Sequence, residues 1–349
     1  MQIDGHTVGT DGPFVIAEVG INHNGEMDMA RSLIDAAINA GADAVKFQSF
    51  IVEELVTASA PKAEYQEGST GESQQEMLKP YELTPEQHRE LQTYCEKQGI
   101  TFLSTPFDSK SLALLDDLDV AAIKVGSGEL TNTPFLREIA EQGRPMIVST
   151  GMSSMNEVEI AVEAIRDTSA DVPLALLHCV SLYPTNVDLA NLRAMQTMND
   201  RFDLPIGFSD HTTQVEIPGI AVAMGASIVE KHLTLDRSLP GPDHEASLEP
   251  DELDRAVEIV RNAERAKGSP DKQPVGDEAD TAFVARKSLH ASKKLDRHDR
   301  FTEENIEITR PADGLPPQEY NKVLDSSAAS AIESGDPITA DHILSTDNE

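Results

Sequence analysis

Short apolar runs recur between residues 14 and 232, and each ends in or beside a polar or ionisable residue. Such a run is typical of a buried strand in a parallel sheet. The runs lie at residues 14–18, 44–48, 102–105, 122–126, 147–150, 175–178, 206–211 and 228–232. The pattern therefore predicts eight parallel strands.

Between these runs, apolar residues recur with the period of a helix that buries one face. The helical segments are 29–40, 84–98, 109–115, 134–141, 156–166, 189–198, 216–224 and 251–267. Eight parallel strands, each followed by a helix, close into an α/β fold of the (β/α)8 TIM-barrel type. In that fold the chemistry occurs at the carboxyl ends of the strands. We therefore expect one pocket lined by Glu18, Lys46, Lys124, Ser149, His178, His211 and His232.

The pattern changes after the last helical segment. Residues 268–282 begin with the Gly and Pro content of a linker, and two short strand-like pieces follow at 287–291 and 306–310. We expect a catalytic barrel at 1–267, a linker at 268–282 and a small domain at 283–349. The small domain is too short to carry chemistry alone.

One interval between predicted strands is longer than the others. Residues 53–80 are rich in Ser, Glu, Gln and Gly and follow the carboxyl end of the second strand. A long loop at that end commonly covers or completes an active site. A solvated surface excursion explains the composition equally well, so both interpretations stay open.

The chain of 349 residues has 61 acidic and 28 basic side chains, which gives a formal net charge of −33. This charge repels nucleic acid and anionic membranes, so we expect neither as a partner. The acidic residues are spread along the chain, which suits concentrated salt and indicates a halophilic source. That hypothesis fails if the protein is folded at low ionic strength and gains no stability in molar KCl.

Cysteine usage and the amino terminus bear on the compartment. Cys95 lies in a helical segment and Cys179 on a strand, so we expect no disulfide, as in a reducing cytoplasm. The first residues lack a basic region followed by an apolar one, and no run of about 18 apolar residues occurs. We therefore expect a soluble cytoplasmic protein.

Lys46 and Lys124 lie among apolar neighbours, where an ammonium group without a partner is costly to bury. Together with nearby hydroxyls they predict a pocket for a small anion that carries phosphate and carboxylate groups. The hydroxyls are those of Ser104, Thr105, Ser127, Ser149, Thr150 and Ser209. The alternative pairs each lysine with a barrel carboxylate such as Glu18 or Glu129. We favour the anion because packing alone would place apolar residues at these strand ends.

His211 and His232 end neighbouring strands of the expected barrel. Two imidazoles at that spacing can share a divalent cation, with water and substrate oxygens in the remaining positions. The alternative is a pair of hydrogen-bonded core histidines, but the position at the rim favours the metal. Glu18 is a candidate proton donor or acceptor, although burial and a lysine would shift its pKa in opposite directions. A turn at 240–244 presents Asp243, which either caps its own backbone or binds a ligand.

These residues lie in motifs that resemble a known family in order and spacing. The motifs are EVGINHNG at 18–25, VKFQ at 45–48, LSTPF at 103–107, KVGSGE at 124–129, STGM at 149–152, LHC at 177–179, GFSDH at 207–211, EKH at 230–232 and GPD at 241–243. The set resembles the sialic acid synthases. Residues 287–343, with TRP at 309–311, resemble their carboxyl-terminal SAF domain, which is related to antifreeze proteins.

The resemblance implies condensation of phosphoenolpyruvate with an open-chain N-acetylated amino sugar, giving a nine-carbon 2-keto acid and phosphate. It implies Mn²⁺ or Mg²⁺ on His211 and His232, which polarises the sugar aldehyde, and a Glu18 that positions or transfers protons. It implies that Tyr183 and Asp243 contact the sugar. The residues implied to hold phosphoenolpyruvate are Lys46, Lys124, Ser127, Ser149, Ser181 and Ser209. Ser181 departs from the Asn or Thr that family members often carry, and its hydroxyl has a shorter reach.

The resemblance also implies a homodimer. In dimers of the family, the SAF domain of one subunit covers the barrel of the other. Arg310 would then reach the N-acetyl group of the sugar in the partner's barrel, so that catalysis requires the dimer.

The substrate that we expect first is N-acetylmannosamine, which would make the chain an N-acetylneuraminate synthase. The alternative is the same chemistry on a diacetamido trideoxy hexose, which gives N,N'-diacetyllegionaminate, and pseudaminate ranks behind it. Two further classes stay open. One is a Schiff-base aldolase with Lys124 as nucleophile. The other is a non-catalytic carbohydrate- or ice-binding protein, suggested by the small domain.

Overall fold

The computed structural model describes residues 1–58, 60–62 and 73–344, and the chain divides into two compact units, Met1–Gly268 and Ser269–Glu349. Unit 1 contains a closed barrel of parallel strands, which confirms the predicted TIM barrel. The strands are β3 (Phe14–Gly20), β4 (Ala44–Ser49), β5 (Thr101–Pro106), β6 (Ile123–Val125), β7 (Met146–Ser149), β8 (Leu174–Cys179), β9 (Ile206–Asp210) and β10 (Ile228–His232). They pair in chain order, and β10 closes the barrel against β3.

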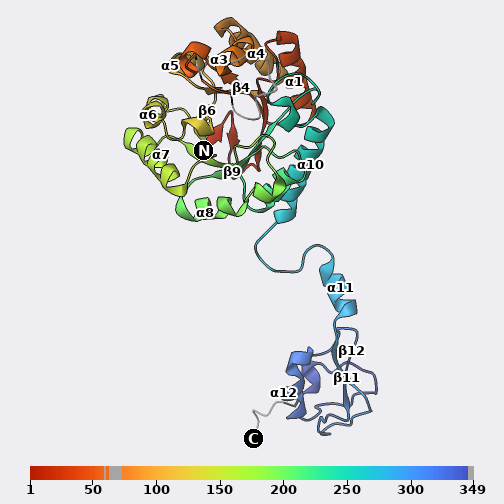
Figure 1. The fold of residues 1–349 in the computed structure, drawn as a ribbon. Helices are drawn as coiled ribbons and strands as arrows, with labels where there is room; N and C mark the ends of the chain where they lie inside the picture. Colours follow the sequence, from red (N-terminus) through yellow and green to blue (C-terminus); the bar gives the residue numbers. More distant parts are fainter. Residues whose placement is uncertain (59, 63–72, 345–349) are drawn as a thin grey trace. The chain divides into compact units, whose positions relative to one another are not determined.

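Helices form a ring around the strands (Figure 1). The helices that follow the strands are α1 (Met27–Asn39), α4 (Pro85–Gln98), α5 (Ser109–Asp117), α6 (Thr133–Glu141), α7 (Met155–Thr168), α8 (Arg193–Arg201), α9 (Ile217–Ala223) and α10 (Pro250–Lys267). Local signals fix the ends of α4: Thr84 and Gln87 form a capping box, and Gly99 ends the helix with φ of 78°. The predicted helical segments therefore correspond to real helices with shifted ends.

The barrel interior has two layers of different chemistry, because successive side chains of a strand point to opposite faces. The lower layer is apolar and contains Phe14, Ile16, Ala44, Leu103, Ala122, Ile147, Ala175, Leu177 and Ile228. The hairpin of β1 (Gln2–Ile3) and β2 (His6–Thr7) closes its amino end, where Ile3 joins the same cluster. The next inward positions toward the carboxyl ends are polar and buried: Glu18, Lys46, Thr105, Lys124, Ser149, Cys179, Ser209 and Glu230.

The same alternation places other ionisable residues outside the barrel. Asp210 on β9 and Lys231 on β10 are register partners, and Lys231 Nζ lies 2.7 Å from Asp210 Oδ2. Both side chains are fully shielded from solvent, since their exposed fractions are 0% and 1%. This outward ion pair joins the two strand ends that carry His211 and His232.

Two predicted positions of polar residues are wrong. His178 points away from the barrel interior, because β8 continues to Cys179 and the inward position falls on that residue. The His178 ring stacks on Phe208 with centroids 5.7 Å apart. Ser104 also points outward, where its hydroxyl lies 2.6 Å from Ser49 Oγ. Neither side chain belongs to the barrel mouth.

The described parts of the long interval after β4 pack against the rim. They form α2 (Val52–Leu55), α3 (Gln74–Leu78) and the 3-10 turn η2 (Lys79–Tyr81). Val52, Met77 and Tyr81 are buried in one apolar cluster with Ile21 and Phe50. The two ends of segment 53–80 are therefore part of the packed structure, whereas residues 59 and 63–72 lie outside the described residues.

Unit 2 is a small module with its own apolar core. Its elements are α11 (Glu278–Ala285), β11 (Ser288–Ala291), β12 (Ile306–Thr309) and α12 (Tyr320–Leu324). The two strands coincide with the strand-like pieces seen in the sequence and pair antiparallel. Leu289 and Phe301 lie in the core of this unit. Helix α11 begins inside the segment expected to be a linker.

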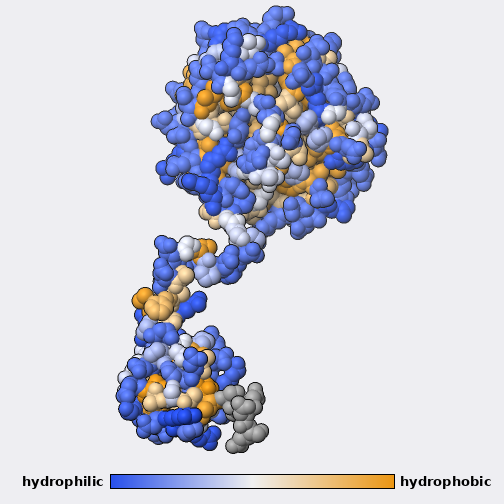
Figure 2. Space-filling view, turned by 180° about the vertical axis from the view of Figure 1, so that it is seen from behind, coloured by the Kyte–Doolittle hydropathy of each residue, from blue (hydrophilic) through white to orange (hydrophobic). Residues whose placement is uncertain are grey.

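The surface agrees with the acidic composition. Hydrophilic residues cover most of each unit on the face that Figure 2 shows. In the described part of the chain, no helix is long and apolar enough to cross a membrane.

Candidate active site

Two lysines and two glutamates form a buried charge cluster at the mouth of the barrel. Lys46 Nζ lies 2.6 Å from Glu18 Oε2 and 3.7 Å from Glu230 Oε2. Lys124 Nζ lies 3.6 Å from Glu230 Oε1. Each side chain is at least 95% shielded, since exposed fractions run from 3% to 5%. Two positive and two negative groups balance one another, which buried charges require.

The two carboxyl groups of this cluster titrate far apart. Burial raises the pKa of Glu18 to about 7, and the nearby Lys46 offsets only part of that rise. Burial acts in the same direction on Glu230, but Lys124 and Lys46 outweigh it and lower the pKa to about 2. Ser209 also donates a hydrogen bond of 2.8 Å to Glu230. Glu230 is therefore ionised at neutral pH while Glu18 is close to half protonated, a difference typical of an acid–base pair.

The lysines partner carboxylates in the way that the alternative interpretation required, with one change. Lys46 pairs with Glu18, but Lys124 pairs with Glu230 rather than with Glu129. The Glu129 carboxylate accepts a hydrogen bond of 2.7 Å from Asn132 Nδ2 instead. Burial lowers the pKa of Lys124, and Glu230 opposes that effect.

One side of the mouth is a wall of hydroxyl groups, which we call the hydroxyl wall: Lys124, Ser127, Ser149 and Ser181. Lys124 Nζ donates to Ser149 Oγ at 2.7 Å. The backbone N–H of Gly151 donates to Ser127 Oγ at 2.9 Å. A Cβ atom on Gly151 would lie 2.8 Å from Ser127 Oγ and would collide with Ser181 Oγ. The missing side chain thus leaves a space that the two hydroxyls occupy, while the Lys124 ammonium lies on the same wall beside Ser149, and this combination suits an anion.

The adjoining side of the mouth we call the imidazole wall: Tyr183, His211, His232 and Asp243. The His211 and His232 rings are 5.4 Å apart between centroids. The Tyr183 ring lies 4.1 Å from the His211 ring and 5.8 Å from the His232 ring. The sequence placed both histidines at this rim, and the structure brings them together.

Asp243 completes the imidazole wall from the loop between β10 and α10. A Cβ atom on Gly20 would lie 3.2 Å from Glu18 Oε1, 3.3 Å from Gln48 Nε2 and 3.6 Å from Asp243 Oδ2. These polar atoms therefore surround one point beside Gly20. Burial raises the pKa of Asp243 to about 6, although His211 and Lys46 act against the rise. The carboxyl group can thus donate or accept a hydrogen bond near neutral pH.

The two histidines fit a divalent cation. His211 Nδ1 lies 2.8 Å from the Val180 carbonyl oxygen, which makes Nδ1 the donor and leaves the Nε2 lone pair open. Burial lowers the pKa of His211, but Cys179 and the Val180 carbonyl outweigh burial, so that the pKa is raised. Burial lowers the pKa of His232 well below its usual value, and its Nδ1 has no hydrogen-bond partner. Among the described residues, no three His, Cys, Asp or Glu side chains could hold a metal together, so two imidazoles would be the contribution of the protein.

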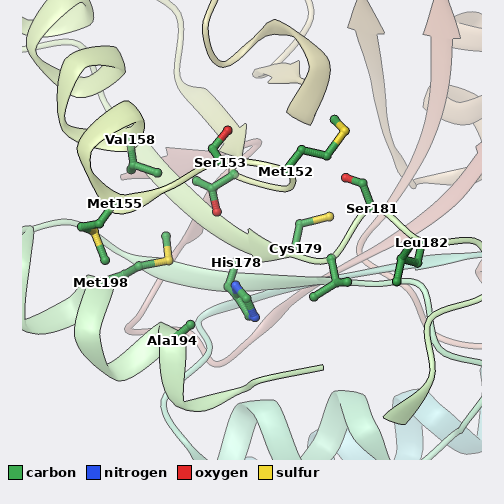
Figure 3. A pocket seen from close by; sticks show the side chains of 12 residues that line it. Met152, Ser153, Met155, Val158, His178, Cys179, Ser181, Leu182, Ala194 and Met198 are labelled. Atoms are coloured by element: carbon green, nitrogen blue, oxygen red, sulfur yellow. The ribbon is translucent and has the colours of Figure 1, made fainter. Parts of the chain in front are cut away.

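A cavity of about 460 Å³ adjoins the hydroxyl wall between the segments that follow β7 and β8 (Figure 3). Ser181 and Cys179 line it together with the methionines Met152, Met155 and Met198. The lining of this cavity is more apolar than the charge cluster. The cavity therefore lies beside the candidate active site and is not part of its charged centre.

Most of the expected site residues meet at this mouth. They are Glu18, Lys46, Lys124, Ser127, Ser149, Ser181, Tyr183, Ser209, His211, His232 and Asp243. Arg310 lies in unit 2 as an exposed residue directly after β12. Glu230 was missed, although it stands two positions before His232 and the strand alternation points both inward.

The chain is similar along most of its length to known proteins. It matches the NeuB family over residues 33–272 and the SAF domain over residues 286–344. The N,N'-diacetyllegionaminic acid synthase of Legionella pneumophila is 41% identical over 335 residues, which cover 95% of this chain and 94% of that relative. The N-acetylneuraminate-9-phosphate synthase of Homo sapiens is 36% identical over 339 residues, which cover 96% and 94%.

A solved structure shows the same kinship. The N-acetylneuraminic acid (sialic acid) synthetase of Leptospira borgpetersenii, in complex with citrate, is 36% identical with a TM-score of 0.72. The match covers 80% of this chain and 94% of that chain. The resemblance to sialic acid synthases is therefore confirmed, and the chain belongs to the NeuB family and carries a SAF domain.

Proposed function

We propose that this protein condenses phosphoenolpyruvate with the aldehyde form of an acylated amino sugar to give a nine-carbon 2-keto acid and phosphate. The buried cluster of Glu18, Lys46, Lys124 and Glu230, open between a hydroxyl wall and an imidazole wall, carries this proposal. Relatives that share more than a third of the sequence include N,N'-diacetyllegionaminic acid synthases and N-acetylneuraminate-9-phosphate synthases, and these names support it.

The hydroxyl wall would bind phosphoenolpyruvate. Ser127 and Ser181 converge on the space above Gly151, and Lys124 supplies a positive charge beside Ser149 on the same wall. Lys46 is occupied by Glu18 at 2.6 Å, so an arriving carboxylate competes for it. Because the pKa of Glu18 is about 7, this residue can take up a proton and leave Lys46 free for the ligand.

The imidazole wall would bind the sugar and orient its aldehyde. Tyr183 offers an aromatic face beside His211, and Asp243 offers a carboxyl group for the sugar hydroxyl or amide groups. A Mn²⁺ or Mg²⁺ ion held by His211 and His232 would act as a Lewis acid on the aldehyde oxygen. Val180 contributes by fixing the tautomer of His211.

In the proposed reaction, the third carbon of phosphoenolpyruvate attacks the aldehyde carbon, so that a C–C bond forms and the aldehyde oxygen becomes a hydroxyl. Water adds to the second carbon, and the C–O bond to phosphate breaks as the ketone forms. Of the two protons of this water, one ends on the new hydroxyl and the other on the phosphate. Glu18 suits the relay because a pKa of about 7 lets it accept and release a proton at neutral pH.

For the sugar, we propose a diacetamido trideoxy hexose, which gives N,N'-diacetyllegionaminate. The sequence favoured N-acetylmannosamine, but two relatives that are 41% and 42% identical carry the legionaminic name, against 36% for the human N-acetylneuraminate-9-phosphate synthase. The test measures phosphate release from phosphoenolpyruvate with each sugar, with and without Mn²⁺. Turnover of N-acetylmannosamine alone would overturn this sugar assignment. Turnover in EDTA, with pyruvate trapped on Lys124 by borohydride, would support a Schiff-base aldolase instead.

We extend the proposal to a homodimer in which the SAF domain of each subunit supplies Arg310 to the barrel of its partner. The exposure of Arg310 supports this assignment. An Arg310→Ala chain and a His211→Ala chain should each be inactive, whereas a mixture that exchanges subunits should regain about a quarter of the activity on statistical grounds. Full activity of Arg310→Ala alone, or a monomeric mass by light scattering, would contradict the dimer.

A further inference from the structure

Asp243 reaches the barrel mouth from a long loop, so its position depends on what holds that loop. The loop runs from Leu233, directly after β10, to Leu248, shortly before α10. Its stem is closed by backbone hydrogen bonds from Thr234 N to Leu248 O and from Leu248 N to His232 O, both 2.9 Å long. The stem alone leaves the far end of the loop, where Asp243 lies, without an anchor.

A first anchor comes from Asn22, which follows β3. The Asn22 side chain is 1% exposed, and its Nδ2 donates to Leu233 O and to Ser247 Oγ, each at 2.9 Å. The Ser247 hydroxyl in turn donates to the backbone carbonyl of Asp243 at 2.6 Å. A continuous chain of hydrogen bonds therefore links Asn22 to the backbone of Asp243.

A second anchor consists of hydrogen bonds to the ring of the next residue, His244. Its Nε2 lies 3.2 Å from Asn24 Oδ1, and its Nδ1 lies 2.7 Å from Thr234 Oγ1. Because Asn24 Oδ1 only accepts, Nε2 carries the proton and Nδ1 accepts from the Thr234 hydroxyl. Gly241 allows this approach, since a Cβ atom there would lie 2.9 Å from His244 Nε2.

We propose that Asn22, Asn24, His244 and Ser247, the loop clamp, are positioning residues that hold the Asp243 carboxyl group at the sugar side of the mouth. The inference deepens the proposed function and rests on contact between Asp243 and the sugar. It also gives a role to the segment after β3, whose asparagines lie 225 and 220 positions from their partners in the chain. None of the four residues needs to touch the substrate.

The clamp is tested by separating the two Michaelis constants. Ser247→Ala removes the donor to Asp243 O, and His244→Leu removes both bonds of the second anchor. Each variant should raise the KM for the sugar by about 5- to 30-fold, the range for one or two lost hydrogen bonds, and leave the KM for phosphoenolpyruvate within about twofold. His244→Gln keeps a donor for Asn24 and should recover most of the sugar affinity. Equal rises in both constants, or no difference between His244→Gln and His244→Leu, would overturn the inference.

Ser227→Ala is the matched control, because Ser227 Oγ also donates to a backbone carbonyl, that of Ile206 at 2.9 Å, at the amino end of the barrel. It should leave the sugar KM unchanged. The amide hydrogen-exchange rate of residues 234–248 tests the loop clamp without an activity assay. Exchange should accelerate in His244→Leu and stay unchanged in Ser227→Ala. If the wild-type protein turns over no sugar, the proposed function fails while the exchange rates still decide on the clamp. Unaltered exchange in His244→Leu would overturn it.

Discussion

The two walls of the barrel mouth are built in different ways. The hydroxyl wall uses three serines on or shortly after strands β6, β7 and β8, together with the buried ammonium of Lys124. The imidazole wall uses rings and a carboxyl group, and two of its members, Tyr183 and Asp243, come from loops. The first wall offers donors and positive charge to an anion. The second offers ring faces and weakly acidic groups to a neutral molecule.

This difference indicates how one mouth would hold the two unlike substrates of the proposed reaction. On the proposed anion wall, Lys124 and Ser149 lie on the neighbouring strands β6 and β7, which fix their positions. On the proposed sugar wall, Asp243 lies on the long loop after β10, where the proposed loop clamp would set its position. Substitutions that affect only one wall should therefore change the KM of only one substrate.

The largest effect is expected from Lys124→Met. The change removes the donor to Ser149 and leaves Glu230 with one lysine, so kcat/KM for phosphoenolpyruvate should fall by about 10²–10³-fold. Steady-state kinetics with either substrate varied would measure it. Lys110→Met, at an exposed lysine paired with Glu54, should change nothing. A selective rise in the sugar KM would mean that the walls are assigned to the wrong substrates.

Asp243→Asn tests the other wall through stability. Folding raises the pKa of Asp243 from 3.8 to about 6, so the folded state binds this proton more tightly, and the stability linked to it is lost as pH rises through that window. The variant does not titrate at this position. It should exceed the wild type in free energy of unfolding by about 3 kcal/mol at pH 8 and match it at about pH 3, below both pKa values. Urea unfolding at both pH values measures the difference, and the sugar KM should rise. An equal difference at both pH values would contradict the raised pKa.

A smaller effect is expected from Gly151→Ala. The new Cβ would push Ser127 and Ser181 out of the anion space, so the KM for phosphoenolpyruvate should rise by about tenfold with little change for the sugar. In a Ser181→Ala background the collision is reduced, and part of the loss should be recovered. Gly128→Ala is the control, because a Cβ there meets nothing within 4 Å. If both glycine variants behave alike, the space above Gly151 does not bind the anion.

The barrel and much of the charge cluster could be predicted from the sequence because strand alternation is a local rule. It placed Lys46 and Lys124 inward from their positions in apolar runs. The same rule, applied two residues before His232, would have found Glu230. The prediction failed at His178 because the predicted strand ended one residue early. In the structure β8 continues to Cys179, which points inward like Ala175 and Leu177, so His178 points outward.

Loop residues were outside the reach of that rule. Tyr183 was expected only from the family resemblance, and for Asp243 the turn left a capping and a binding role open, because a loop has no period that tells which way a side chain points. The space above Gly151 depends on three segments that meet in the fold, so no local pattern signals it. The pKa values of Glu18 and Glu230 likewise depend on which lysine each carboxyl group faces.

The outward ion pair of Asp210 and Lys231 has a consequence for how the chain reaches this arrangement. Asp210 directly precedes His211, and Lys231 directly precedes His232. A slip of β9 or β10 by one residue would therefore turn an imidazole outward to the helices and a charged side chain inward to the barrel interior. Joining Asp210 to Lys231 makes such a misaligned barrel costly. The outward face of the sheet thus fixes the register that brings the two imidazoles together on its inward face.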